Sequence, residues 1–221
     1  GFPPETSISL LKKLSTDSYW AVRYAVAQSL ASFFPEVALP LLENLSADSD
    51  SSVREAVAES LASFPPEAAI PLLEKLCADP NEDVRCAVAR SLTSLPPEKA
   101  LPLLEKLSTD PDYSVRQTVA WSLASFPPKV VISLLEKLST DCHKNVQKNA
   151  HRTLLRSFLP QLLQDAIARE DHRTILNLLS KFPLVASCIK FEYELNPTPF
   201  LKRILSIASI TRQKADLDVS M

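Results

Sequence analysis

The chain has 221 residues, of which 46% are hydrophobic, and a formal net charge of −2 at pH 7. This hydrophobic content is too high for a disordered chain, and the small net charge gives no bulk attraction to nucleic acid or anionic membranes. No apolar run is long enough to span a bilayer, and a single glycine rules out a glycine-rich phosphate-binding loop.

The first residues, "GFPPE", repeat the sequence "SFPPE" found at residues 63–67. Phe2 therefore takes a repeat position that Phe33, Phe64 and Phe126 also occupy, at the end of a helix pair. We expect the chain to be a fragment, with further repeats or another domain preceding residue 1.

From this junction onward, residue types recur with a period of 31. One column is aspartate (Asp17, Asp48, Asp79, Asp110, Asp141), and another is arginine (Arg23, Arg54, Arg85, Arg116). Leucine and proline columns run in parallel. A strict period of this length is typical of a solenoid. The sequence predicts an all-α solenoid of stacked antiparallel helix pairs, with five units within residues 1–157, at about 3–33, 34–64, 65–95, 96–126 and 127–157.

Each unit is predicted to contain two helices, as residues 96–126 illustrate. Pro97 suits the first turn of a helix, where a backbone N–H is dispensable, whereas Pro102 should kink the helix or restart it. The segment "STDPD" then forms a turn, with Asp110 as the expected N-cap of the second helix. That helix continues through Phe126 and ends at the next Pro-Pro pair.

Beyond residue 157 the period is lost. Residues 158–210 are predicted to form a degenerate helical repeat and C-terminal capping helices, which would cover the exposed end of the stack. Residues 211–221 are expected to be a flexible tail.

The repeat resembles a known family. The segments "DPNEDVRCAVARSL" and "DPDYSVRQTVAWSL" are similar to the short HEAT repeat of the phycobilisome-lyase type. In that family the first helices line the convex face and the second helices the concave face. One departure is the ending "SLASFPP" in place of an Ala-Leu-Gly element, which predicts a stiffer turn between repeats.

The aspartate and arginine columns are interpreted as structural. Their members lie six apart in every unit, so each aspartate is expected to cap its second helix, and each arginine to pair with it or with the aspartate of a neighbouring unit. A repeated ion pair is not a set of groups converging on one catalytic site.

Variable columns of the second helices are the candidate binding surface. They mix aromatic, acidic, polar and basic residues, which a core would not accept. Trp121 is therefore predicted to be exposed. The candidate partner-binding residues on the concave face are Trp20, Tyr24, Gln28, Glu55, Glu59, Cys86, Arg90, Tyr113, Gln117, Trp121, Lys144, Lys148 and Arg152. A bound partner is expected to place its acidic end near Lys148 and its basic end near Glu55 and Glu59.

The cysteines and histidines give no site. Cys77, Cys86, Cys142 and Cys188 have neither paired nor metal-binding spacing, so free thiols in a cytoplasmic protein are expected. His143 and His151 lie eight residues apart, which is not the spacing of a helical metal site. The sequence assigns no catalytic residue, metal or cofactor.

The sequence is compatible with three functions. The first is a non-catalytic interaction or scaffold module that binds a peptide, helix or protein domain, with a bacterial signalling protein as one possible context. The second, implied by the resemblance, is a phycobilin lyase-like subunit or bilin chaperone. The third is nucleic-acid binding, which Glu55, Glu59 and Glu82 disfavour because they repel phosphates. Membrane binding is not expected, and the oligomeric state is left open.

Overall fold

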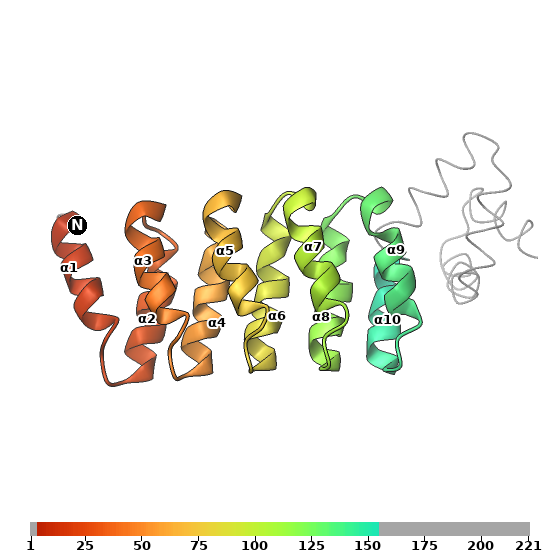
Figure 1. Ribbon diagram of the computed structural model, residues 1–221, viewed down its shortest axis with the longest axis horizontal. Helices are drawn as coiled ribbons and strands as arrows, with labels where there is room; N and C mark the ends of the chain where they lie inside the picture. The colour runs from red at the N-terminus through yellow and green to blue at the C-terminus, as the bar shows by residue number, and fades with distance from the viewer. Residues whose placement is uncertain (1–3, 155–221) are drawn as a thin grey trace, which may run out of the picture. The chain divides into compact units, whose positions relative to one another are not determined.

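The computed structural model describes residues 4–154, and every regular element in that range is a helix (Figure 1). The chain divides into two compact units, residues 1–150 and 151–221. First and second helices alternate in a stack of pairs. The first helices are α1 (Pro4–Leu14), α3 (Pro35–Leu45), α5 (Pro66–Leu76), α7 (Pro97–Leu107) and α9 (Pro128–Ser139). The second helices are α2 (Trp20–Leu30), α4 (Ser51–Ser60), α6 (Glu82–Ser91), α8 (Tyr113–Ser122) and α10 (Lys144–Thr153).

This architecture confirms the predicted α-solenoid. The helical repeat and cap expected at residues 158–210, and the tail at 211–221, lie outside the described residues. None of the helices between residues 4 and 154 is both long and apolar enough to cross a membrane.

The first helices begin at proline and pass through a second proline without a break. Pro97 is the first residue of α7, and Pro102 lies inside it. Of the two expectations for Pro102, a kink or a restart of the helix, the restart was wrong. Because proline has no backbone N–H, Pro102 cannot donate the helical hydrogen bond to the carbonyl four residues earlier. Both Pro102 and Glu98, which carries that carbonyl, are exposed, so water can satisfy the oxygen. Pro40 and Pro71 occupy the same position in α3 and α5.

The N-caps of the second helices differ from those expected. Asp112, not Asp110, caps α8, and its carboxylate accepts the backbone N–H of Ser114. Asp50 and Asn81 are the corresponding caps of α4 and α6. Asp110 lies two residues earlier and instead accepts the N–H of Asp112 at 2.9 Å, which closes the turn before the helix. The prediction that the aspartate column caps the second helices was therefore wrong.

Three second helices also end earlier than predicted. After α4, α6 and α8 the chain tightens into single 3₁₀ turns, η1 (Leu61–Ser63), η2 (Leu92–Ser94) and η3 (Leu123–Ser125). Phe64, Leu95 and Phe126 then adopt extended backbone. Each of these residues precedes a proline, which disfavours the helical conformation in the preceding residue.

The core repeats from unit to unit. Leu104 is fully buried, as are its equivalents Leu42, Leu73 and Leu135. The second helices contribute a matching valine column, also fully buried: Val53, Val84, Val115 and Val146. Helices α2, α4, α6 and α8 pack side by side more closely than the first helices do.

Candidate interaction surface

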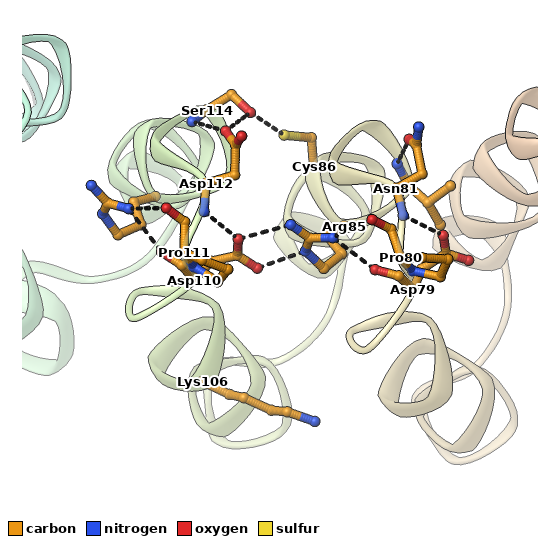
Figure 2. A network of polar contacts seen from close by, with 12 residues as sticks. Asp79, Pro80, Asn81, Arg85, Cys86, Lys106, Asp110, Pro111, Asp112 and Ser114 are labelled. Atoms are coloured by element: carbon orange, nitrogen blue, oxygen red, sulfur yellow. Dashed lines mark hydrogen bonds and ion pairs between the residues drawn. The ribbon is translucent and has the colours of Figure 1, made fainter.

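A line of arginine–aspartate pairs connects successive units, and Figure 2 shows one of them. Arg85 donates from Nε and Nη2 to the two carboxylate oxygens of Asp110 in the next unit, at 2.7 and 2.9 Å. Its Nη1 donates to the carbonyl oxygens of Asp79 and Pro80 in its own turn, at 2.7 and 3.2 Å. One guanidinium therefore holds two consecutive turns together, and we call this line the ladder.

The ladder repeats with nearly identical geometry. The other pairs are Arg23–Asp48, Arg54–Asp79 and Arg116–Asp141, with Nε to oxygen distances of 2.6, 2.7 and 2.7 Å. In the fifth unit the arginine position is Gln147, whose amide donates to the carbonyl of Asp141. Bidentate pairs of this kind are strong and geometrically specific. The ladder groups therefore bind one another and the backbone of the turns, as their structural interpretation requires.

Hydrogen bonding within the ladder lowers the pKa of its carboxyl groups. The Arg23 side chain lowers the pKa of Asp48, and the Arg116 side chain lowers that of Asp141. Burial opposes this effect at Asp79, but the hydrogen bonds from Arg54 and from the Asn81 N–H outweigh it, so the pKa of Asp79 is also lowered. These carboxylates are therefore more stable as anions in the folded protein than in the unfolded chain.

The binding candidates of the first unit form an aromatic cluster on α2. Trp20 lies between Tyr19 and Tyr24, with ring centroids 6.1 and 6.3 Å away, and its ring meets that of Tyr24 edge-on. Gln28 donates to the Tyr24 hydroxyl at 2.7 Å. Tyr19, which was not among the predicted binding residues, is 59% exposed, and Trp20 is 41% exposed. The adjacent aromatic residue was the signal that could have identified it.

The acidic candidates of the second unit are paired with the third unit. Arg90 Nη2 lies 2.9 Å from Glu55 Oε1 and 3.5 Å from Glu59 Oε1. Burial raises the pKa of Glu55, and repulsion from Glu59 adds to the rise. The two glutamates therefore share one arginine. The net charge of Glu55, Glu59 and Arg90 together is −1, whereas the two glutamates alone would carry −2. The expected attraction to a basic end of a partner is correspondingly weaker.

Cys86 departs from the predicted exposure. It is only 6% exposed, and its Sγ lies 3.7 Å from the Ser114 hydroxyl oxygen on the next second helix (Figure 2). The Thr118 hydroxyl of the same helix donates to this Sγ at 3.5 Å. The middle column of the second helices, which includes Cys86, faces the following unit. A short side chain there is covered, whereas longer ones such as Glu55 and Gln117 are only half-buried. Cys86 was therefore wrongly selected as a surface contact.

The fourth and fifth units carry exposed aromatic and basic groups. Trp121 is 66% exposed, and Tyr113 is 44% exposed while stacking on His143, with ring centroids 3.8 Å apart and planes at 21°. Lys144 and Lys148 are exposed on α10, as is Arg152, which lies beyond residue 150. His143 was not selected from the sequence as a binding residue, although it directly precedes Lys144.

The three described cysteines are free thiols. Burial raises the pKa of Cys77 to about 11, which leaves it protonated and unreactive near neutral pH. Cys142 is exposed beside the last pair of the ladder, where its Sγ lies 3.6 Å from Arg116 Nη2. Between residues 4 and 154, no group of three or more histidine, cysteine, aspartate or glutamate residues is placed to hold a metal ion.

A stack of helix pairs joined by a repeated polar ladder defines an α-solenoid repeat protein. The family model for HEAT repeats matches residues 7–85 and 76–156, which together cover more than half of the chain. The chain belongs to the HEAT-repeat family, and the resemblance of its repeat to that family is confirmed.

Solved structures share this fold. The YibA protein of Escherichia coli is 15% identical, with a TM-score of 0.59 over 93% of this chain and 82% of its own. The CpcE–CpcF complex of phycocyanin lyase from Nostoc sp. PCC7120 is 23% identical, with a TM-score of 0.53 over 67% of this chain and 98% of that one. The Schizosaccharomyces pombe condensin Cnd3–Cnd2 subcomplex is 18% identical, with a TM-score of 0.61 over 96% of this chain but only 32% of that one. No curated protein matches the chain in sequence.

Proposed function

We propose that the chain is a non-catalytic interaction module that binds a peptide, a helix or a protein domain along its second helices, as a sensor or scaffold segment of a larger cytoplasmic protein. We call the proposed surface the second-helix stripe. It consists of Trp20, Tyr24, Gln28, Glu55, Glu59, Arg90, Tyr113, Gln117, Trp121, Lys144, Lys148 and Arg152, with Tyr19 and His143 added from the structure.

The exposure of Trp121 is the observation that carries the proposal. A tryptophan with 66% of its surface exposed contributes little to the core. Tryptophan and tyrosine are the residues most enriched where binding energy concentrates in protein interfaces. Trp20 and Tyr113 repeat the feature at 41% and 44% exposure. Other positions of the stripe are polar, which suits the rim of an interface.

The spacing of the aromatic groups favours an extended partner. Trp20 and Trp121 lie on α2 and α8, three units apart in the stack. Neighbouring helices pack about 8–10 Å apart, so three steps amount to about 25–30 Å. A small metabolite cannot contact both rings at that distance. An extended peptide of about nine residues or a helix of about twenty can do so.

The charges of the stripe favour one orientation of the partner. Lys144 and Lys148 are exposed, and no ion pair within residues 4–154 joins either of them to a carboxylate, whereas Glu55 and Glu59 share Arg90. An acidic group on the partner therefore gains most near the fifth unit. Such complementarity sets orientation and association rate more than affinity.

The proposal can be tested with a displayed library of random peptides selected against the full chain. Counter-selection against a Trp20→Ala/Trp121→Ala double variant removes peptides that bind elsewhere. The affinity of an enriched peptide is then measured by calorimetry for each single variant. Phe34→Ala is the matched control, because Phe34 is 79% exposed but lies outside the stripe.

We expect Trp121→Ala to weaken binding by about 1–4 kcal/mol and Phe34→Ala to change it little. We also expect the enriched peptides to carry acidic residues. Lys148→Glu should weaken the binding of these peptides by slowing their association. A selection that yields no peptide, or only peptides that bind the double variant equally well, would contradict the proposal.

A further inference from the structure

The residue directly before α10 is a histidine, in a repeat position that holds aspartate or asparagine before α4, α6 and α8. The side chains of Asp50, Asn81 and Asp112 each accept the backbone N–H of the residue two positions later, at 2.9, 2.8 and 2.7 Å. His143 takes this position before α10, and its ring Nδ1 accepts the N–H of Asn145 at 3.4 Å. His143 is therefore the N-cap of α10, with a ring nitrogen as the acceptor in place of an oxygen.

The acceptor that caps α10 exists only in the neutral imidazole. Nδ1 can accept the Asn145 N–H because the single ring proton of this form lies on Nε2, whereas an imidazolium carries a proton on both nitrogens. Histidine gains its second proton between about pH 8 and pH 5, a range in which aspartate and asparagine keep their oxygen acceptors. A protonated His143 therefore loses the capping hydrogen bond and places a positive charge at the positive end of the α10 dipole.

The other contacts of His143 do not involve Nδ1. Its backbone N–H donates to Asp141 Oδ1 at 2.8 Å, and its carbonyl accepts the N–H groups of Val146 and Gln147 at 3.0 and 3.2 Å. Its ring stacks on Tyr113 of the preceding unit, with centroids 3.8 Å apart. The position of the ring is thus set by its neighbours, and the protonation of Nδ1 decides whether it caps the helix.

Ionisable groups surround the capped turn on three elements. They are Glu136 and Lys137 in the last turn of α9, Asp141, Cys142, Lys144, Lys148 and His151 on the turn and α10, and Asp112, Tyr113 and Arg116 at the start of α8. Asp141 is paired with Arg116, and Asp112 accepts the N–H and the hydroxyl of Ser114. Between residues 4 and 154 no ion pair joins His143 to a carboxylate. Protonation of the ring therefore removes the cap without an existing ion pair to offset the loss.

We propose that His143 is a pH-sensitive N-cap, which makes α10 an acid-labile helix of the described stack. With a neutral ring the first turn of α10 is capped, and with a charged ring it frays, while α4, α6 and α8 keep their caps. Lys144 and Lys148 lie in the first turns of α10, so acidification loosens the segment that carries them. The proposal concerns the folding of α10 and holds whether or not the second-helix stripe binds a partner.

The test follows the full chain by NMR at about pH 7.5 and about pH 5.5, which bracket the titration of histidine. Ring ¹⁵N shifts of His143 report which nitrogens carry protons. Hydrogen exchange, corrected for the intrinsic effect of pH, reports the protection of the Gln147 amide in the first turns of α10. The Arg116 amide at the matching position of α8 is the internal reference, since Asp112 caps that helix.

Three variants are compared with the original chain. His143→Asn installs the side chain that caps α6 at Asn81, which does not titrate. His143→Ala removes the cap at both pH values. His151→Asn removes the other histidine of α10 and leaves the cap in place.

We expect ring Nδ1 of His143 to be unprotonated at the higher pH and protonated at the lower one. Between the two, protection of the Gln147 amide should fall by about threefold to tenfold in the original chain and in His151→Asn, in keeping with the usual contribution of an N-cap. It should stay constant in His143→Asn and be low at both pH values in His143→Ala. Protection of the Arg116 amide should change little.

Three results would overturn the proposal. The first is a neutral His143 ring with its proton on Nδ1, because that nitrogen could not then accept the Asn145 N–H. The second is an equal loss of protection in His143→Asn, which would assign the pH dependence to another group. The third is unchanged protection of Gln147 in the original chain while the ring becomes charged, or protection in His143→Ala as high as in the original chain at the higher pH. Either observation would mean that the cap does not stabilise α10.

Discussion

Removal of the Leu104 side chain tests the packing of the stack most simply. Leu104 is fully buried on α7, with leucine at the same position in every unit. Leu104→Ala deletes three carbon atoms, and burial contributes about 0.8 kcal/mol for each methylene, which amounts to about 2.5 kcal/mol. The cavity left behind adds to this, so the expected loss of unfolding free energy is about 2–5 kcal/mol.

The assay is urea unfolding followed by circular dichroism, with amide hydrogen exchange to locate the loss. Because repeats couple mainly to their neighbours, protection should fall most in the units on either side of α7, and unfolding can depart from two-state behaviour. Leu10→Ala is the control, since Leu10 is 53% exposed and its truncation should cost much less. A loss below about 0.5 kcal/mol for Leu104→Ala would mean that the helix faces are misassigned.

Three further predictions concern the ladder and the choice between functions. Arg85→Ala should lower the unfolding free energy by about 2–4 kcal/mol, a value between those for exposed and buried ion pairs. At a temperature where the variant stays folded, its affinity for a selected peptide should be unchanged. Lost affinity at unchanged stability would instead place the ladder in the binding site. Folding lowers the pKa values of Asp48, Asp79 and Asp141 from the ordinary 3.8. These carboxylates therefore stabilise the folded protein at pH values above 3.8, and this stabilisation is lost as the pH falls from 3.8 toward their lower pKa in the folded protein. The cost of Arg54→Gln, measured by unfolding at a series of pH values, should therefore shrink below about pH 4, and a constant cost would refute the assigned pairing. Finally, adding a phycobilin should leave its absorbance spectrum unchanged, and a shift would favour a lyase-like or bilin-carrying role.

The fold could be predicted from the sequence because one structural unit is repeated. A leucine such as Leu104 is uninformative alone, but a column of leucines at intervals of 31 shows that the environment recurs. The same logic predicted a structural role for the arginine and aspartate columns. It did not determine which neighbour each arginine would bind, because spacing within a unit does not give the distance between units.

The errors arose where two residues of similar chemistry compete for one role. Asp110 and Asp112 can both cap a helix, and only the backbone path of the turn shows that Asp112 does so while Asp110 closes the turn. The recurrence of Asp50 and Asn81 directly before α4 and α6 was the available signal.

The burial of Cys86 was not predictable from its variable column, because coverage by the next unit depends on side-chain length.

The candidate interaction surface was only partly predictable. Exposure of Trp121 followed from the residues that replace it in other units, among them Glu59 and Arg90. The pairing of Arg90 with Glu55 and Glu59 joins two units and is invisible within one repeat. The stacking of Tyr113 on His143 joins two units in the same way.

Acrylamide quenching of Trp121, with and without a selected peptide, tests the binding role of the stripe most directly. A Trp20→Phe variant leaves Trp121 as the only tryptophan in the chain. In the free protein we expect red-shifted emission and efficient quenching, in keeping with 66% exposure. On saturation with peptide the emission should shift to the blue and quenching should fall several-fold. A peptide that binds tightly while Trp121 remains fully accessible to acrylamide would contradict the proposed role of the stripe.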